Sequence, residues 1–365
     1  MLVPHTHTHA HAPAGAWGGG VEKKMTEEER ETRPRALGRP QPFHHLVCPY
    51  LRLPLSLSSC GAPLPLGIAG LRVLDLGCGS GRDCYAAAAL VGPAGTVTGV
   101  DMTTEQLDVA RAHAEAYCTA TLGYAAPNLA FVEGFMEDLA GAGIAPGSID
   151  LAISNCVVNL SPDKPAVLRG VWEALAPGGE FYFSDVYSDR RLSDAARADE
   201  VLWGECVSGA LYVEDFMRAA VGAGFAYPVA LAASPIAVND PAMRAVLGPA
   251  RFYSITYRLF KLPAGALETC CEDYGQVATY KGTIPGSEGA YTLDAGHTFE
   301  AGRPALVCGN TAAMLGEGSV SWLAKHFEVT GDRSVHFGKF GGGDPVKLTS
   351  DGKGGSVSAS AGGCC

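Results

Sequence analysis

The sequence predicts an α/β fold in which a parallel, doubly wound sheet is covered by helices on both faces. Between residues 71 and 186, short apolar runs alternate with stretches of helical pattern. The first apolar run ends in a glycine-rich turn, DLGCGSG at 75–81, which leads directly into a helical stretch. Strands that alternate with helices form βαβ units, and such units build parallel sheets between two helical layers.

Local signals place the elements of this half of the chain. Pro93 and Gly95 end the first helical stretch. Thr103 and Gln106 have the spacing of a capping box, so a helix is expected to begin there. Residues 177–179 (Pro-Gly-Gly) form a turn before the last strand. The expected strands are 71–76, 96–101, 129–134, 151–155 and 180–186, and the expected helices are 82–91, 103–117 and 163–175.

The second half of the chain has a looser pattern. Residues 194–225 look helical in two pieces with a hinge at 204–209, and residues 252–262 are rich in β-formers. Five parts are therefore expected. They are a low-complexity segment at 1–66, a cofactor-binding domain at 67–188, a substrate-binding domain at 189–262, a C-terminal α+β domain at 263–340 and a flexible tail at 341–365.

Composition excludes several classes of protein. A net charge of −11 and only short basic clusters argue against a nucleic-acid binder. No apolar run reaches the roughly 18 residues of a membrane span, and the N-terminus lacks the pattern of a secretory signal. We expect a monomer in the cytosol that contacts neither nucleic acid nor membrane.

Twelve cysteines are many for a chain in a reducing compartment. Disulfides are rare there, so thiols serve packing, ligand binding or redox chemistry. We assign about half of these cysteines to the core, because cysteine without a disulfide is commonly buried. The vicinal pairs Cys270–Cys271 and Cys364–Cys365 fit that interpretation least well.

A cofactor site is expected at the glycine-rich turn. The glycines permit a tight passage from strand to helix. Asp101 ends the next strand, where one carboxylate can accept hydrogen bonds from both hydroxyls of a ribose. Arg82 stands where the dinucleotide pattern GxGxxG requires glycine, and Asp75 would repel a pyrophosphate but attract a cationic amino-acid group. The sequence therefore favours S-adenosylmethionine over NAD.

The expected contacts of this cofactor come from the ends of several strands, and two of them, Phe135 and Met136, would form an apolar floor beneath the adenine. The full set is Asp75, Gly77, Cys78, Gly79, Gly81, Asp101, Met102, Gln106, Phe135, Met136 and Asn155.

The acceptor is expected beside Cys156. Ligands of open α/β sheets bind outside the carboxyl ends of the strands, and Cys156 directly follows the strand at 151–155. A thiol here, in place of an amide or carboxylate that would hold an amine or hydroxyl, changes the acceptor that we expect. Trp203 lies three positions before Cys206, so both side chains are expected on one helix face.

Several segments together resemble arsenite methyltransferases. They span about residues 67–340, and the pair SNCVVNL (154–160) and GECVSGALY (204–212) is the most specific. The others include VLDLGCGSGRDCY, GVDMTTEQL, PGGEFYFSDVY, FYSITYRLFKL, CEDYGQVATYKGTIPG and FEAGRPALVCGNTAAML.

The resemblance implies a class I methyltransferase fold, Rossmann-like, with an arsenic-binding domain and a C-terminal domain. It also implies that three thiolates bind trivalent arsenic: Cys156, Cys206 and a cysteine ahead of the first strand. Cys60 has about the right distance for this third role, although Leu57-Ser58-Ser59 replaces the aromatic pair and glycine of the family. The implied activity is methylation of arsenite in arsenic detoxification, with glutathione or thioredoxin as reductant.

Thiolates suit this chemistry, because trivalent arsenic is a soft ion. Its lone pair carries no proton, so no general base is needed for attack on a methyl group, and positioning and desolvation would supply most of the rate. Two alternatives remain: a methyltransferase that acts on oxygen, nitrogen or carbon of another small molecule, and a thiol-rich protein that sequesters arsenic without turnover. The intact glycine-rich turn disfavours the second.

Overall fold

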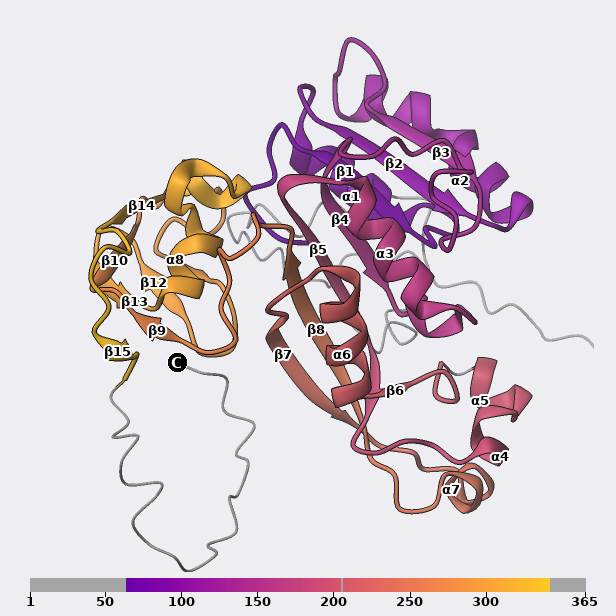
Figure 1. Ribbon diagram of the computed structural model, residues 1–365. Helices are drawn as coiled ribbons and strands as arrows, with labels where there is room; N and C mark the ends of the chain where they lie inside the picture. The colour runs from indigo at the N-terminus through magenta and orange to yellow at the C-terminus, as the bar shows by residue number, and fades with distance from the viewer. Residues whose placement is uncertain (1–63, 205, 342–365) are drawn as a thin grey trace, which may run out of the picture. The chain divides into compact units, whose positions relative to one another are not determined.

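The computed structural model describes residues 64–204 and 206–341 (Figure 1). The predictions for the segment 1–63, which contains Cys60, and for the tail 342–365 with its vicinal cysteines lie outside these residues. In the described part of the chain, no helix is long and apolar enough to cross a bilayer.

An eight-stranded sheet forms the centre of the fold, with strand order β3-β2-β1-β4-β5-β8-β7 and with β6 paired to β5. β1 to β5 are parallel, β8 is antiparallel to β5, and β7 is antiparallel to β8. The predicted doubly wound α/β fold is thus confirmed, with one antiparallel strand. The strands are β1 Arg72–Leu76, β2 Thr96–Asp101, β3 Leu129–Glu133, β4 Ile149–Asn155, β5 Leu175–Ser188, β6 Leu211–Tyr212, β7 Val229–Ile236 and β8 Phe252–Phe260.

Helices pack on both faces of this sheet, because its strands are apolar on both sides. Val73 of β1 belongs to the core shared with α1 and α2, whereas its neighbour Leu74 belongs to the core shared with α3 and α6. Figure 1 shows α3 and α6 along the same side of the sheet. The helices are α1 Arg82–Val91, α2 Thr104–Ala116, α3 Lys164–Ala174 and α6 Val213–Ala223, and a π-turn at Tyr117–Thr121 extends α2.

Two local predictions are wrong in detail. The Thr103 side chain makes no capping hydrogen bond to α2, because the Thr103 N–H is itself held by the carboxylate of Asp101 at 2.9 Å and Gln106 is exposed. The expected turn at 177–179 is an irregularity within β5, where pairing with β4 jumps from Leu175 to Glu180.

The segment expected as the substrate-binding domain, 189–262, contributes β7 and β8 to the central sheet. Its remaining elements are α4 Asp194–Arg197, α5 Glu200–Gly204 and α7 Pro241–Leu247. They enclose a small core of their own, against which Cys156 and Cys206 pack. The predicted hinge at 204–209 falls in the loop between α5 and β6.

The C-terminal segment contains a three-stranded antiparallel sheet and two small ribbons, as the alternation of short strands and turns predicts. It is joined to the main sheet at a buried ion pair within that sheet, Arg258 of β8 with Glu180 of β5 at 2.6 Å. Arg258 also donates to the Tyr291 hydroxyl, and the Trp322 indole donates to Glu180. The elements are β9 Glu272–Asp273, β10 Gln276–Tyr280, β11 Ala290–Thr292, β12 Thr298–Glu300, β13 Pro304–Val307, α8 Gly309–Leu315, β14 Phe327–Thr330, β15 Gly338–Lys339 and 3₁₀ turns at Glu317–Ser319 and Trp322–His326. A further 3₁₀ turn, Val158–Leu160, lies between β4 and α3.

Candidate functional site

The glycine-rich turn joins β1 to α1 with three left-handed residues. Gly77, Gly79 and Gly81 have φ angles of 64°, 53° and 85°, which other L residues rarely adopt. A Cβ at Gly77 would lie 2.6 Å from the Val157 side chain, and one at Gly81 would lie 2.7 Å from the Phe131 ring. A Cβ at Gly79 would meet only Gln106, at 3.9 Å. Packing therefore requires two of these glycines, and the middle one borders open space.

Asp101 organises this turn from the end of β2. Its carboxylate accepts hydrogen bonds from the Gly79 N–H at 2.8 Å and from the Thr103 N–H at 2.9 Å, one on each oxygen. Each carboxylate oxygen retains acceptor capacity. This fixed and partly exposed carboxylate is suited to a ribose diol.

Apolar side chains beside the turn are left facing outward. Met102 and Phe135 have exposed fractions of 63% and 60%, and Met136 is half-buried. Met102 follows Asp101, and Phe135 follows β3, the neighbour of β2 in the sheet. Within the described residues, Met136 packs against the core, whereas Met102 and Phe135 leave apolar surface uncovered. With the open space at Gly79, they fit an adenosine moiety.

Two buried acids lie behind the turn. Burial, with a contribution from Asp83, raises the pKa of Asp75 to about 8, and the Cys84 thiol donates to its carboxylate at 3.1 Å. The Asn155 amide donates to Asp83 at 3.1 Å, so the end of β4 is tied to the start of α1. Cys78 is buried within the turn, with an exposed fraction of 9%.

Cys156 and Cys206 adopt an unusual backbone conformation. Their φ angles are 57° and 59°, and they are the only residues other than glycine with positive φ in the described part of the chain. Such a conformation costs on the order of 1–3 kcal/mol per residue and is concentrated at functional sites. The Cys206 sulfur lies 3.3 Å from the Cys156 carbonyl oxygen, so the structure brings together two residues that are 50 positions apart.

The backbone packing between their two loops fixes this arrangement. A Cβ at Gly209 would lie 2.0 Å from the Asn159 carbonyl oxygen, so the loop after Cys206 rests directly on the loop after Cys156. Buried Asp185, three residues before the end of β5, accepts a hydrogen bond from the Asn159 N–H at 2.9 Å, and burial raises its pKa to about 7. The Cys156 N–H bonds to the Ser184 carbonyl at 2.8 Å.

The prediction that Trp203 and Cys206 share a helix face is wrong. Helix α5 ends at Gly204, and the left-handed backbone of Cys206 carries the chain away from it. The Cys206 N–H still bonds to the Trp203 carbonyl, but the Trp203 side chain is half exposed, at 51%. Helical spacing could not reveal a helix that ends before the second cysteine.

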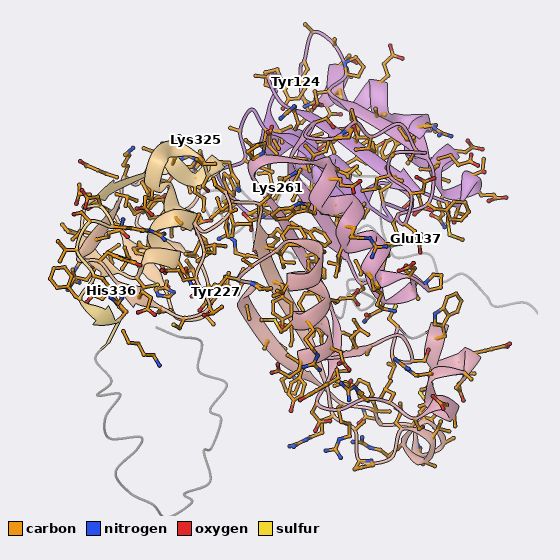
Figure 2. The ribbon with its side chains drawn as sticks, viewed as in Figure 1. Tyr124, Glu137, Tyr227, Lys261, Lys325 and His336 are labelled. Carbon is orange, nitrogen blue, oxygen red and sulfur yellow. The ribbon has the colours of Figure 1, made fainter. Side chains whose placement is uncertain are left out.

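The cysteine loops adjoin the glycine-rich turn. The contact of Val157 with the position of Gly77 places the residue after Cys156 directly against the turn. A hydrogen bond from Ser161 to Glu137 links the end of the same loop to the segment after β3 (Glu137 is labelled in Figure 2). The sulfur of Cys156 is disulfide-bonded in this structure.

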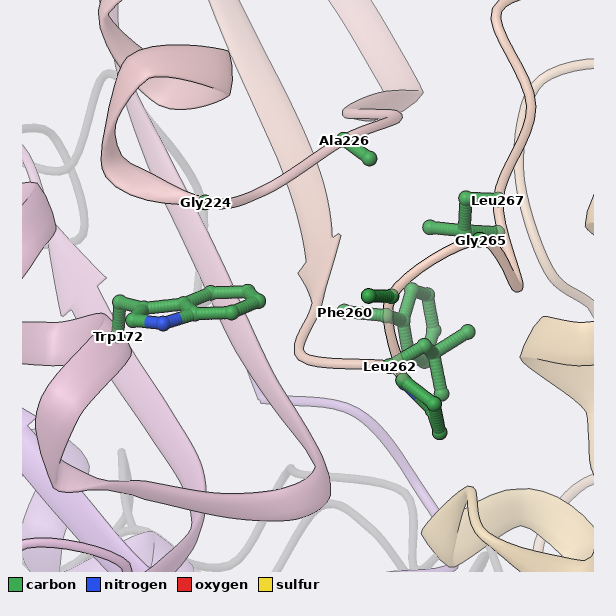
Figure 3. Close-up of a pocket in the computed structure, with 9 residues that line it drawn as sticks. Trp172, Gly224, Ala226, Phe260, Leu262, Gly265 and Leu267 are labelled. Carbon is green, nitrogen blue, oxygen red and sulfur yellow. The ribbon is translucent and has the colours of Figure 1, made fainter.

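A further cavity within the described residues has no catalytic or ligand-binding groups. A cavity of about 150 Å³ lies between the end of α6 and the segment that follows β8 (Figure 3). Its lining contains no titratable group: Trp172, Gly224, Ala226, Phe260, Leu262, Pro263, Ala264, Gly265 and Leu267.

Sequence reasoning missed Asp185, Asn159 and Gly209 as supports of the cysteine loops. Asn159 and Gly209 lie within the two most specific motifs, so position relative to each cysteine was an available signal. The contact between Gly209 and Asn159 could not be predicted from the sequence, because it joins distant segments of the chain.

Together the strand order, the glycine-rich turn and the acidic end of β2 define an S-adenosylmethionine-dependent methyltransferase of class I.

Comparison with known proteins narrows this class. Residues 69–224 match the model of a methyltransferase domain. The chain is 53% identical over 289 residues to the arsenite methyltransferase of Aquipseudomonas alcaligenes, which covers 78% of this chain and 81% of that protein. It is 45% identical over 256 residues to the arsenite methyltransferase of Rattus norvegicus, covering 70% and 68%.

A solved structure agrees with these relatives. The crystal structure of an arsenic(III) S-adenosylmethionine methyltransferase from Chlamydomonas reinhardtii superposes with a TM-score of 0.74 and 56% sequence identity, covering 79% of this chain and 96% of that one. The chain belongs to the arsenite methyltransferase family.

Proposed function

We propose that this chain transfers methyl groups from S-adenosylmethionine to trivalent arsenic bound by thiolates, which yields methylated arsenicals and serves arsenic detoxification. One observation carries the proposal. Two cysteines, which alone among the described non-glycine residues have a left-handed backbone, lie together beside the glycine-rich turn, with the Cys206 sulfur 3.3 Å from the Cys156 carbonyl oxygen. Cys60 is proposed as the third thiolate. Within this function, segment 67–188 would bind the cofactor and segment 189–262 would hold arsenite.

The chain's own residues would supply binding and orientation. As arsenite binds, each thiol proton leaves with an arsenic hydroxyl as water, and an arsenic–sulfur bond replaces an arsenic–oxygen bond. Cys156 and Cys206 thereby fix the arsenic atom, while Asp101, Met102 and Phe135 would hold the adenosine moiety. When bound, S-adenosylmethionine would supply an electrophilic methyl group: the arsenic lone pair would form the As–C bond as the S–CH₃ bond breaks, S-adenosylhomocysteine would leave, and no proton would be lost. Arsenic would thereby change formally from trivalent to pentavalent, and two thiols of the reductant would return it to the trivalent state as they form a disulfide. The expected acceleration of methyl transfer comes from the orientation of the two reactants and from the exclusion of water.

A thiol reductant completes the proposed cycle. The disulfide at Cys156 must be reduced before this sulfur can bind arsenic. Two thiols, of glutathione or of a thioredoxin, would give two electrons and two protons and leave as a disulfide. Reductant should therefore be required to activate the protein.

The test is product formation by the purified full-length chain. Arsenite, S-adenosylmethionine with a labelled methyl group and glutathione should give labelled methylarsenicals, with one S-adenosylhomocysteine per methyl transferred. Asp101→Ala should weaken cofactor binding and turnover, whereas Cys118→Ser, a buried core thiol, should leave both nearly unchanged. Arsenite binding without any transfer would instead support sequestration, and transfer only to other small molecules would overturn the proposal.

A further inference from the structure

A second set of thiols lies away from the cysteine loops. Cys271, before β9, and Cys308, before α8, both line one cavity of about 620 Å³, a size typical of small-molecule sites. Both side chains are buried, each with an exposed fraction of 1%. The thioethers of Met217 and Met314 line the same cavity. Four sulfur-bearing side chains thus surround one hollow.

Each of these thiols has a hydroxyl group beside it. The Tyr227 hydroxyl lies 3.6 Å from the Cys271 sulfur, and the Thr311 hydroxyl lies 3.4 Å from the Cys308 sulfur. Figure 2 labels Tyr227, which enters the cavity from the segment between α6 and β7. A hydroxyl can donate to a thiolate sulfur, so each sulfur has a partner in the deprotonated state that soft ligands require.

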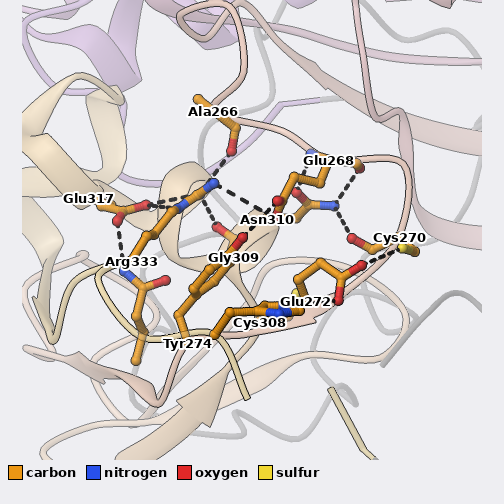
Figure 4. A network of polar contacts seen from close by, with 12 residues as sticks. Ala266, Glu268, Cys270, Glu272, Tyr274, Cys308, Gly309, Asn310, Glu317 and Arg333 are labelled. Atoms are coloured by element: carbon orange, nitrogen blue, oxygen red, sulfur yellow. Dashed lines mark hydrogen bonds and ion pairs between the residues drawn. The ribbon is translucent and has the colours of Figure 1, made fainter. Parts of the chain in front are cut away.

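A polar network fixes the segments that carry the two thiols. Asn310, two residues after Cys308, accepts from the Glu268 N–H at 2.7 Å and donates to the Glu268 carbonyl at 2.9 Å (Figure 4). Arg333 donates to the Gly309 carbonyl at 2.7 Å. These hydrogen bonds hold the residues before Cys271 and after Cys308 together, and none of them uses a side chain that lines the cavity.

We propose that this cavity is a second arsenical site, in which Cys271 and Cys308 bind one monosubstituted trivalent arsenical such as a monomethyl species. An arsenic atom with one carbon substituent has two bonds left, which matches two thiols. Two As–O and two S–H bonds break, two As–S and two O–H bonds form, and two waters leave, with no change of oxidation state. The identity of the physiological ligand, a methylated arsenical, rests on the proposed function. The binding of an arsenical by two thiols is independent of that function.

The test uses the full-length chain with Cys156→Ser and Cys206→Ser, which removes the transfer site, and phenylarsine oxide as probe. Retained arsenic is measured after gel filtration in competition with a small dithiol. Cys271→Ala and Cys308→Ala should each lower the affinity at least tenfold. Cys118→Ala, also fully buried but outside the cavity, should leave it unchanged. Equal retention in all variants, as binding by Cys364 and Cys365 would give, overturns the proposal.

A loss of binding in a cavity variant could also come from a folding defect. X-ray absorption at the arsenic edge avoids this ambiguity, because it counts sulfur neighbours without any substitution in the cavity. One equivalent of the probe on the Cys156→Ser, Cys206→Ser chain should show two sulfur neighbours per arsenic atom, and one or three would contradict the site. Methyl transfer to arsenite reports separately on the proposed function. It should persist in the chain with only Cys271→Ala and Cys308→Ala.

Discussion

The glycine-rich turn and the two cysteine loops handle the same backbone requirement in different ways. Both contain left-handed residues: those of the turn and Cys156 lie just beyond the carboxyl ends of β1 and β4, and Cys206 lies just beyond helix α5. In the turn these residues are all glycine, so the conformation costs little. In the loops they are Cys156 and Cys206, and the strain remains in the folded protein.

The difference shows what each region needs. The cofactor turn requires only a backbone shape, together with the carboxylate of Asp101 from a neighbouring strand. Under the proposed function, the acceptor site would require both this backbone shape and a sulfur at the same position, so glycine could not replace either cysteine. The strain is the consequence of placing a reactive side chain at a sharp change of chain direction.

The largest effect should come from separating the two cysteine loops. Gly209→Ala would place a Cβ 2.0 Å from the Asn159 carbonyl and displace Cys206. We expect methyl transfer to fall about 100-fold, as misplacement of a reacting group does, with cofactor affinity unchanged. Gly204→Ala is the matched control, because nothing lies within 4 Å of its added Cβ. Single-turnover methylation rates of the two variants give the comparison. Equal rates would disprove that packing of Gly209 against Asn159 positions Cys206.

A change in the glycine-rich turn should act on stability and cofactor affinity instead. Gly81→Ala combines a φ of 85° with a 2.7 Å approach to the Phe131 ring, so we expect a loss of about 2 kcal/mol in unfolding free energy. Gly318→Ala is the matched control, because Gly318 has a similar backbone conformation, with φ 69° and ψ 10° against 85° and 13° at Gly81, but nothing lies within 4 Å of its added Cβ; it should cost only about 1 kcal/mol. Urea unfolding distinguishes them. Equal losses would show that packing against Phe131 does not matter.

The protonation of Asp75 should make cofactor binding depend on pH. Burial raises its pKa to about 8, so the carboxyl is protonated in the free protein at neutral pH. A cationic ligand favours the ionised form, and binding therefore releases a proton. Affinity for S-adenosylmethionine should rise with pH, at most tenfold per unit, and level off above about 8. Calorimetry should show that Asp75→Asn abolishes this slope; a pH-independent affinity of the wild type would refute the role.

The smallest effect tests the strain itself. At Cys206 the φ of 59° suits glycine better than alanine. The Cys206→Gly variant should therefore be more stable than Cys206→Ala by about 1 kcal/mol, although neither retains the thiol. Thermal unfolding of the two variants gives the comparison. An alanine variant as stable as the glycine variant would mean that the loop relaxes and stores no strain.

Most of the sheet could be predicted from the sequence, since apolar runs and breaking residues report on local structure directly. β2 and α1 have the predicted bounds, and β1 begins one residue later than predicted. The antiparallel position of β8 beside β5 could not be predicted, because strand order depends on tertiary pairing. The capping prediction at Thr103 failed for the same reason: the Asp101 carboxylate, two residues away, determines the local hydrogen bonds.

The candidate site was predictable in its residue types but not in its geometry. Motif position singled out Cys156 and Cys206, yet their left-handed backbone and the support from Gly209 depend on contacts between distant segments. Helical spacing led to the wrong placement of Trp203. The third thiolate Cys60, the cytosolic location and the monomeric state stay predictions.

In the proposed function, Cys156 and Cys206 bind the same arsenic atom. The most direct measurement is single-turnover methylation of arsenite by the wild type, Cys156→Ser, Cys206→Ser and the double variant, under reducing conditions. If both sulfurs act on one atom, each single variant should lose as much activity as the double variant, because effects within one unit are not additive. Independent, additive losses, or near wild-type rates in either single variant, would contradict the account.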